Sequence, residues 1–311
     1  MAKQTFAVSS DSPILDTCEG TSSYTGVRDN CTLKTISLPE QLIINKGSSV
    51  VAFDYQVEQE STKQQVNLSM NTFSFLTEGN KEVYSDTKFS AISNSEFLLM
   101  KSGKCLMTEK FTDTLKRYRS ILFFFTDEAL LRFIRKYSIV LSKMTERKSV
   151  QSIKYDDYLR SFAKSLAHLV NLSSVHRDKV LQVKFEELML YLIDKEGVEL
   201  LSSFVISTNE HEHHFQEIVE NNKLNRLTIN ELAFLCNMSI STFKRTFERQ
   251  FHTSPSKWFQ ERRLEYAALL LKSEGKRPTD IYLQVGYDSL TNFIQAFKSK
   301  YGMTPKQYQL D

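Results

Sequence analysis

The C-terminal part of the chain carries one hydrophobic pattern twice, 50 residues apart. In each copy aromatic side chains recur every fourth position, after a serine and before a proline. This spacing places the rings on one face of a helix, and the serine is a favourable N-cap. The sequence therefore predicts two copies of one small helical unit. The first copy is Ser239, Phe243, Phe247, Phe251, Pro255 and Trp258, and the second is Ser289, Phe293, Phe297, Tyr301, Pro305 and Tyr308.

A further short helix is predicted in front of each copy. Thr228 and Glu231 have the spacing of a capping box, and Asn237 suits the left-handed conformation of a tight turn. The segment 278–287 precedes the second copy and closes on Gly286. A helix, a tight turn and a serine-capped helix form the helix-turn-helix pattern. Two units held in register suit a periodic partner, and DNA is such a partner.

The segment from about His211 to Leu310 resembles the DNA-binding domain of the AraC/XylS family of bacterial transcription activators. A predicted linking helix over residues 256–272 joins the two units, as the family pattern requires. The resemblance covers about a third of the chain, and its motifs are specific because both units, the linker and the terminal Gly-x-Thr-Pro are present. The matching residues are Ala233, Ser239-x-x-x-Phe243-Lys244-Arg245-x-Phe247, Ala267-x-x-Leu270-Leu271, Ile281, Val285-Gly286-Tyr287, Phe293-x-x-x-Phe297-Lys298 and Tyr301-Gly302-x-Thr304-Pro305-x-x-Tyr308.

The resemblance implies which side chains read DNA. In the first unit, Ser241, Lys244 and Arg245 would face the major groove, where arginine matches the two acceptors of guanine. The alternative is that Lys244 and Arg245 contact only phosphates. In the second unit, Asn292 and Gln295 can pair with adenine. The predicted DNA-contacting residues are Ser241, Lys244, Arg245, Arg249, Thr291, Asn292, Gln295 and Lys298.

Three residues depart from the family pattern. Pro278 stands where an aliphatic residue is usual, Tyr282 where alanine is usual, and Gln295 where arginine is common. With fewer cations and no arginine for guanine, the second unit is expected to contribute less affinity than the first and to prefer A·T-rich sequence.

The N-terminal region has the character of short strands. Apolar or alternating runs at 42–44, 50–55, 73–76, 97–100 and 119–125 are separated by polar turns. This pattern predicts a small antiparallel barrel or sandwich, and the family resemblance implies a cupin-like β-barrel. The fold class is therefore α+β: a barrel with packed helices, then an all-α domain with two helix-turn-helix units. We expect a β-rich sensing domain over residues 1–125, a helical subdomain over 126–207 and the DNA-binding domain over 208–311.

Three amphipathic helices are predicted between these regions, over residues 127–144, 158–170 and 179–195. Such helices often only pack on the adjacent barrel. The resemblance implies instead that they form a homodimer, with Phe185, Leu188 and Leu192 near the interface.

Charge distribution adds to this interpretation. Residues 239–311 contain twelve lysines and arginines and seven acids, a balance of +5 against +3 for the whole chain, which suits a surface facing phosphates. The first residues lack the apolar core of a secretory signal, and no run is long enough to span a membrane. The four cysteines have no metal-ligand spacing. We therefore expect a cytoplasmic protein with reduced thiols and no membrane association.

The sequence predicts no catalytic residues, no cofactor and no metal. The cluster His211-Glu212-His213-His214 lacks a second pair of ligands, and neither a phosphate-binding glycine loop nor a nucleophile elbow occurs. The favoured function is a sequence-specific transcription regulator, an activator by resemblance, whose expected partners are double-stranded DNA, a second copy and RNA polymerase. A small effector in the barrel and a partner protein on its outside both remain open. The alternative is a cupin-type metal-dependent enzyme fused to a regulatory tail.

Overall fold

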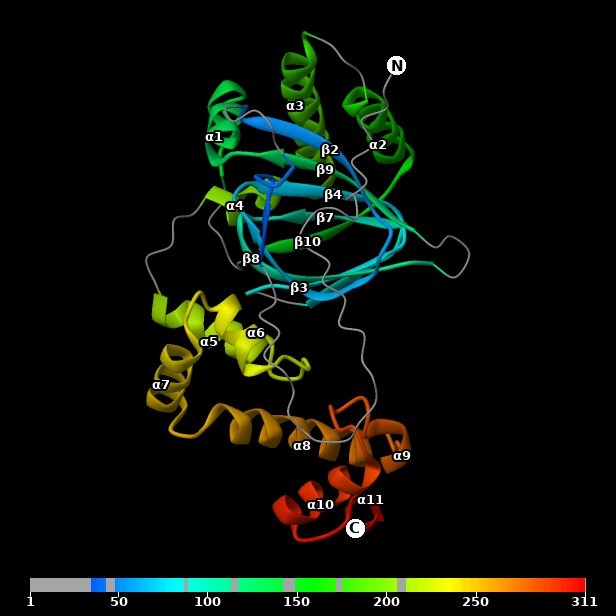
Figure 1. Cartoon of the computed structure of the whole chain (residues 1–311), viewed down its shortest axis with the longest axis vertical. Helices are drawn as coiled ribbons and strands as arrows, with labels where there is room; N and C mark the ends of the chain where they lie inside the picture. Colours follow the sequence, from blue (N-terminus) through cyan, green and yellow to red (C-terminus); the bar gives the residue numbers. More distant parts are fainter. Residues whose placement is uncertain are drawn as a thin grey trace, which may run out of the picture. The chain divides into compact units, whose positions relative to one another are not determined.

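The computed structural model describes residues 35–42, 48–86, 89–112, 117–141, 149–171, 175–205 and 211–310 (Figure 1). Internal contacts divide the chain into two compact units, residues 1–209 and 210–311. The sequence predicts a boundary between residues 207 and 208. Each unit is described by itself below.

The described residues of the N-terminal unit form two five-stranded sheets. The first has the order β1-β3-β8-β5-β6, and the second has the order β10-β7-β4-β9-β2. All ladders are antiparallel except the pairing of β1 with β3. The strands are β1 (Ile36–Leu38), β2 (Val50–Val57), β3 (Ser61–Leu68), β4 (Asn71–Glu78), β5 (Asn80–Tyr84), β6 (Phe89–Ile92), β7 (Glu96–Met100), β8 (Gly103–Lys110), β9 (Tyr118–Phe125) and β10 (Val150–Lys154).

Within the described residues, no ladder joins the two sheets, so the unit is a sandwich rather than a closed barrel. The predicted α+β class is confirmed, and of the barrel and the sandwich that the strand pattern allows, the structure forms the sandwich, because the described strands of one sheet pair with none of the other. In β9 the unbroken apolar run Ile121–Phe125 contributes to two cores. Leu122 and Phe124 pack between the sheets. Ile121, Phe123 and Phe125 point to the opposite face, because side chains alternate along a strand.

Helices cover that opposite face (Figure 1). They are α1 (Asp127–Lys136), α2 (Asp157–Val170), α3 (Arg177–Glu196) and α4 (Glu199–Val205). Thr126 and Asp156 cap α1 and α2 by accepting hydrogen bonds from Ala129 N and Leu159 N. Phenylalanines of the sheet meet those of the helices, with the rings of Phe125 and Phe185 5.0 Å apart. This aromatic layer holds the helices on the sheet.

The predicted helix over 127–144 is too long. It ends at Lys136, and Ser138 adopts a left-handed conformation with φ of 50°. The chain then forms β10, a strand that the sequence patterns do not reveal because Val150–Lys154 is half polar. The predicted strand over 42–44 lies largely outside the described residues.

The C-terminal unit is all helical. Its helices are α5 (His211–Asn221), α6 (Ile229–Leu235), α7 (Ile240–Phe251), α8 (Pro255–Ser273), α9 (Pro278–Ile281), α10 (Leu290–Tyr301) and α11 (Pro305–Leu310). Two small cores form, one around Phe243 and Phe247 and one around Phe293 and Phe297. Helix α8 serves both, because its first turns contribute Trp258 and Phe259 to one core and its later turns contribute Leu264, Ala267, Leu270 and Leu271 to the other.

Candidate nucleic-acid interface

The first candidate reading helix is α7. Ser239 is its N-cap, and the Oγ atom accepts a hydrogen bond from Thr242 N at 3.2 Å. Phe243 and Phe247 are fully buried against α6 and α8, which fixes the rotation of the helix about its axis. The face opposite these rings is exposed, and it carries Ser241, Lys244, Arg245 and Arg249. All four predicted contact residues of this unit therefore lie on one solvent-facing surface.

The turn before α7 is built as the sequence predicts. Thr228 and Glu231 form a reciprocal capping box at the start of α6, with hydrogen bonds of 2.6 and 3.2 Å. Asn237 has a φ of 56°, and the Met238 amide bonds Ala233 O at 2.9 Å. These bonds close the chain tightly between α6 and α7, so α6 acts as the support of the reading helix.

The second candidate reading helix is α10. Ser289 caps it by accepting from Asn292 N at 3.2 Å, and Phe293 and Phe297 are fully buried. Gly302 ends it in a left-handed conformation with φ of 74°. The exposed face carries the four residues that the sequence predicts for this unit, namely Thr291, Asn292, Gln295 and Lys298.

The segment that precedes α10 is less helical than predicted for residues 278–287. Helix α9 ends at Ile281, and hydrogen-bonded turns continue to Gly286. Gly286 has a φ of +91°, and a Cβ atom there would lie 3.0 Å from Arg263 Cδ. The left-handed backbone conformation favours glycine at this position, and an added Cβ would press against the Arg263 side chain of α8. Tyr282, where the family usually has alanine, packs half-buried against the second core.

Cations are distributed unequally between the two units. Lys244 and Arg245 form no ion pair with any residue that the structure describes, and their charge faces solvent. On α10, Lys300 is drawn back onto α8, where it donates to Glu261 O at 3.0 Å and to Glu265 Oε1 at 2.9 Å. Lys298 is then the one exposed cation of α10 among its described residues. From these exposed cations we expect a stronger electrostatic attraction for phosphates at α7 than at α10.

The three residues predicted near a dimer interface are buried within the N-terminal unit. Phe185, Leu188 and Leu192 are fully buried in the core between α3 and the second sheet. Their side chains cannot reach a second molecule while this unit is folded, because other atoms of the same chain already cover them. The sequence showed apolar residues on more than one face of this helix, and the exposed ones are Val180, Val183 and Leu190.

No group of three histidine, cysteine, aspartate or glutamate side chains in the described part of the chain is placed to hold a metal ion. The side chains of His211 to His214 lie outside the described residues. None of the described helices is both long and apolar enough to cross a membrane. Cys105 is buried in the sandwich, and burial raises the pKa of its thiol to about 12.

Comparison with known proteins covers both units. A family model described as the ExsA N-terminal regulatory domain matches residues 71–204, and one described as a helix-turn-helix domain matches residues 232–310. The HTH-type transcriptional regulator ExsA of Pseudomonas aeruginosa is 24% identical over 277 residues, which are 87% of this chain and 94% of that protein. The virulence regulon transcriptional activator VirF of Yersinia enterocolitica is 32% identical over 130 residues, which are 42% of this chain and 48% of that protein. A solved structure of ToxT from Vibrio cholerae aligns with 84% of this chain and 98% of its own, at 14% identity and a TM-score of 0.38.

Proposed function

We propose that this chain is a transcription regulator of the AraC/XylS family and that it activates transcription by reading two adjacent major-groove segments of its target DNA. It is a sequence-specific DNA-binding regulator with an N-terminal regulatory domain. The relatives ExsA and VirF carry the descriptions transcriptional regulator and transcriptional activator. Activation is therefore the favoured direction of regulation.

One observation carries the DNA-reading proposal. The eight predicted contact residues are all exposed, four on α7 and four on α10, and each set lies opposite a buried pair of phenylalanines. A single helix, α8, packs on both units. Reading helices of such paired units enter major-groove segments about one helical turn, roughly 34 Å, apart. One molecule can then recognise an asymmetric site.

In this proposal Arg245 donates hydrogen bonds to a guanine base, and Lys244 contacts either the same base edge or a neighbouring phosphate. The arginine fork matches the O6 and N7 acceptors of guanine, whereas the second unit offers the amides of Asn292 and Gln295 for adenine. Ile294 beside them is half-buried and can meet a thymine methyl group.

The experiment is to select binding sites from random DNA with the full chain and then to titrate Arg245→Ala on the selected and on random duplexes. Loss of a base contact costs about 1–3 kcal/mol on the selected site and relaxes preference at one base pair. Lys164→Ala, a change of equal charge on the exposed surface of α2, is the matched control. Equal losses of affinity on selected and random DNA would mean that Arg245 contacts only phosphate.

Homodimerisation through the helical subdomain is also proposed. The support is the exposed apolar surface of α3, formed by Val180 (39% exposed), Val183 (64%) and Leu190 (40%), which replaces the three buried residues predicted first. RNA polymerase is the expected partner of an activator, and the cytoplasm is the expected location because the target is DNA. An effector, either a small molecule or a partner protein, would act on the N-terminal unit.

The protein is proposed to work without catalysis. The competing function is a metal-dependent enzyme in the sandwich fused to a DNA-binding tail. Metal analysis of the purified protein separates the two, because a metal enzyme retains a stoichiometric ion. A stoichiometric, tightly held transition metal would favour the enzyme.

A further inference from the structure

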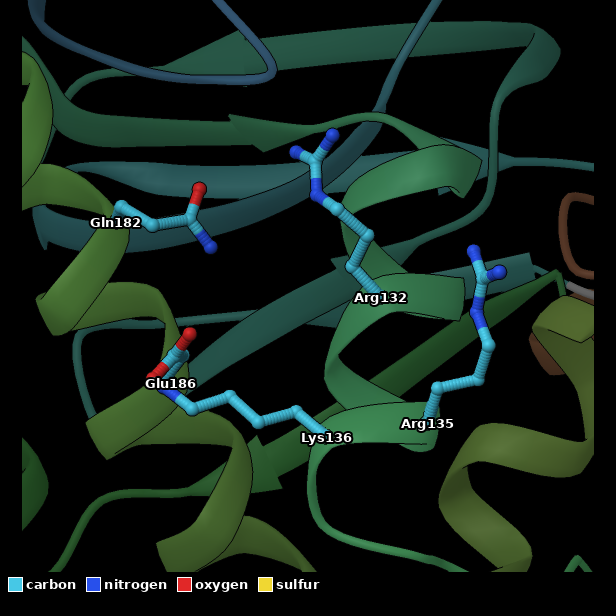
Figure 2. A pocket seen from close by; sticks show the side chains of 5 residues that line it. All are labelled: Arg132, Arg135, Lys136, Gln182 and Glu186. Atoms are coloured by element: carbon cyan, nitrogen blue, oxygen red, sulfur yellow. Dashed lines mark hydrogen bonds and ion pairs between the residues drawn. The ribbon is translucent and has the colours of Figure 1, made fainter.

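The outer surface of the N-terminal unit has a charged hollow between α1 and α3. It measures about 620 Å³ and is lined by Arg132, Arg135 and Lys136 from α1 and by Gln182 and Glu186 from α3. Figure 2 shows that the side chains of Arg132 and Arg135 extend from α1 in the same direction, while Lys136 reaches across to Glu186. We name this surface the α1–α3 hollow. Three cations and one carboxylate give its lining an excess of two positive charges.

The single carboxylate of the hollow is already engaged. Glu186 Oε2 accepts from Lys136 Nζ at 2.7 Å and from Tyr137 OH at 3.0 Å. Burial acts to raise the pKa of Glu186, but the hydrogen bonds from Lys136 and Tyr137 outweigh it and hold the pKa below its usual value. Glu186 therefore stays ionised and occupied, and it leaves the two arginines to face outward.

Of the two arginines, Arg135 is the less satisfied. Its Nε atom donates to Leu131 O one turn back in the same helix at 3.2 Å, and no carboxylate among the described residues lies within ion-pair distance. Arg132 donates to Glu128 Oε1 at 2.9 Å and to Ser49 Oγ at 2.6 Å, and both side chains of the Arg132–Glu128 pair are exposed, by 46% and 74%. Exposed pairs of this kind contribute little and exchange readily with a better partner.

Apolar surface borders the arginines. Leu131 is 42% exposed and lies four positions before Arg135, so these two residues share one side of α1, and Arg132 lies three positions before Arg135. Tyr137 is 38% exposed at the end of the same helix. Arginine beside exposed aliphatic and aromatic side chains is the composition that protein–protein interfaces favour.

We propose that the α1–α3 hollow is a docking site for an acidic, amphipathic segment of a partner protein. Carboxylates of that segment would pair bidentately with the guanidinium groups of Arg132 and Arg135, and an apolar side chain beside them would cover Leu131. The charge of the hollow selects an acidic partner, and its open, shallow form suits a protein segment better than an enclosed small molecule.

A second copy of this chain is a poorer occupant. A two-fold interface brings the same patch of two molecules together. Centred on this hollow, such an interface would set Arg132 and Arg135 against the same arginines of the partner, and like charges facing each other disfavour association. The hollow thus favours a different protein, and the inference does not depend on how the C-terminal unit reads DNA.

The test uses the full chain and a synthetic helical peptide whose one face alternates glutamate and leucine. A matched peptide with lysine in place of each glutamate is the charge control. Calorimetric titration is expected to detect the acidic peptide and not the basic one. Arg135→Glu should weaken binding of the acidic peptide by at least about tenfold. Lys164→Glu, the same charge reversal on neighbouring α2, should change it by less than about twofold. Circular dichroism confirms that both variants are folded.

Hydrogen exchange places the contact, with protection by the acidic peptide expected on α1 and α3. Three outcomes would overturn the proposal. Equal weakening by Arg135→Glu and Lys164→Glu would mean attraction to net charge alone. Failure of the acidic peptide to bind better than the basic one would remove the charge selection. If free glutarate displaced the acidic peptide at a concentration similar to that of the peptide, the hollow would be a binding site for a small dianion rather than for a protein segment.

Discussion

Lys81 and Glu109 form an ion pair inside the β-sandwich, with Lys81 Nζ 3.3 Å from Glu109 Oε1 and side chains only 2% and 7% exposed. They are direct cross-strand neighbours on β5 and β8. The second sheet completes the group, since Tyr55 OH donates to Glu109 Oε2 at 3.1 Å and Lys81 Nζ donates to Ser74 Oγ at 3.4 Å. Burial, followed by the charge of Glu109, raises the pKa of Tyr55 well above its ordinary value. The pair therefore ties the two sheets together through polar contacts.

Breaking this pair from one side should destabilise the N-terminal unit strongly. Lys81→Met leaves the Glu109 charge buried without its partner, which costs about 3–5 kcal/mol. The double change Lys81→Met and Glu109→Leu should recover most of that loss, because no buried charge remains. Lys110→Met, which breaks the exposed pair with Glu82, is the control and should cost less than about 1 kcal/mol. Hydrogen exchange of the amides in β5 and β8 measures these differences. Similar losses for Lys81→Met and Lys110→Met would contradict the role of the buried pair.

A pH dependence is expected where α2 meets α3. Burial acts to raise the pKa of Asp156, but hydrogen bonds from Leu159 N, Lys195 and Tyr191 outweigh it and lower the pKa to about 2. The unfolded value is near 3.9. The carboxylate therefore stabilises the fold above pH 4, and this contribution is lost as the pH falls from about 4 to 2.

Asp156→Ala should cost about 1–2 kcal/mol at pH 7, as removal of an N-cap does, with little added by the ion pair because Asp156 is 34% exposed. Urea titrations of the wild type and the variant, repeated at decreasing pH, measure the difference in their free energies of unfolding. This difference should shrink below pH 4. A difference that stays constant down to pH 3 would show that the charge of Asp156 is not involved.

Two glycines with similar backbone conformations allow a matched comparison. Gly275 has a φ of +62° and open space around it, whereas Gly286 has a φ of +91° and packs against Arg263. Gly275→Ala should cost only the strain of a left-handed alanine, about 1 kcal/mol. Gly286→Ala adds a clash with the Arg263 side chain, so its loss of thermal stability should be clearly larger. Melting followed by circular dichroism measures both, and equal shifts would mean that Arg263 moves aside freely.

The proposed dimer can be separated from the core by two kinds of substitution on α3. Val183→Glu with Leu190→Glu places charges on exposed positions, so the protein should stay folded and sediment as a monomer. Leu188→Asp instead buries a charge in the core and should unfold the N-terminal unit. Analytical ultracentrifugation with circular dichroism distinguishes these results. A folded double variant that associates like the wild type would exclude this face of α3.

The helix-turn-helix units could be predicted almost residue by residue because their signals are local. Caps at Thr228, Ser239 and Ser289 and the left-handed Asn237 are set by neighbours a few positions away, and the structure contains each of them. The choice between base and phosphate contact at Arg245 stays a prediction, because it depends on a DNA molecule that the chain alone does not contain.

The N-terminal unit was less predictable because its organisation depends on distant contacts. Charged side chains are mostly exposed, so no pattern in the sequence marks Lys81 and Glu109 as buried, yet they meet across β5 and β8 in the interior. The family resemblance placed Leu188 near a dimer interface, and the helical pattern could not correct this because it shows which face is apolar but not what covers that face. The second sheet covers that face, and the sheet is assembled from strands as far apart as β2 and β10.

The two reading helices differ in a way that bears on affinity. Helix α7 presents Lys244 and Arg245, which are exposed and form no ion pair with a described residue. Helix α10 presents Lys298, since Lys300 is held by Glu261 and Glu265 on α8. Each cation that neutralises a phosphate releases counterions, so the unit with more exposed cations should dominate both affinity and its salt dependence.

The first unit is therefore expected to contribute most of the binding free energy. Lys244→Ala with Arg245→Ala should weaken binding to the selected site more than Asn292→Ala with Gln295→Ala, and it should reduce the slope of log K against log salt by about 1 for each phosphate that is no longer neutralised. The second pair should leave the slope unchanged and relax preference for A·T base pairs, because amides read adenine without adding charge. Titrations at several salt concentrations measure both quantities. If the second pair weakens binding as much as the first, Gln295 is an ordinary variation whose neighbours carry the same energetic weight, and the two units contribute equally.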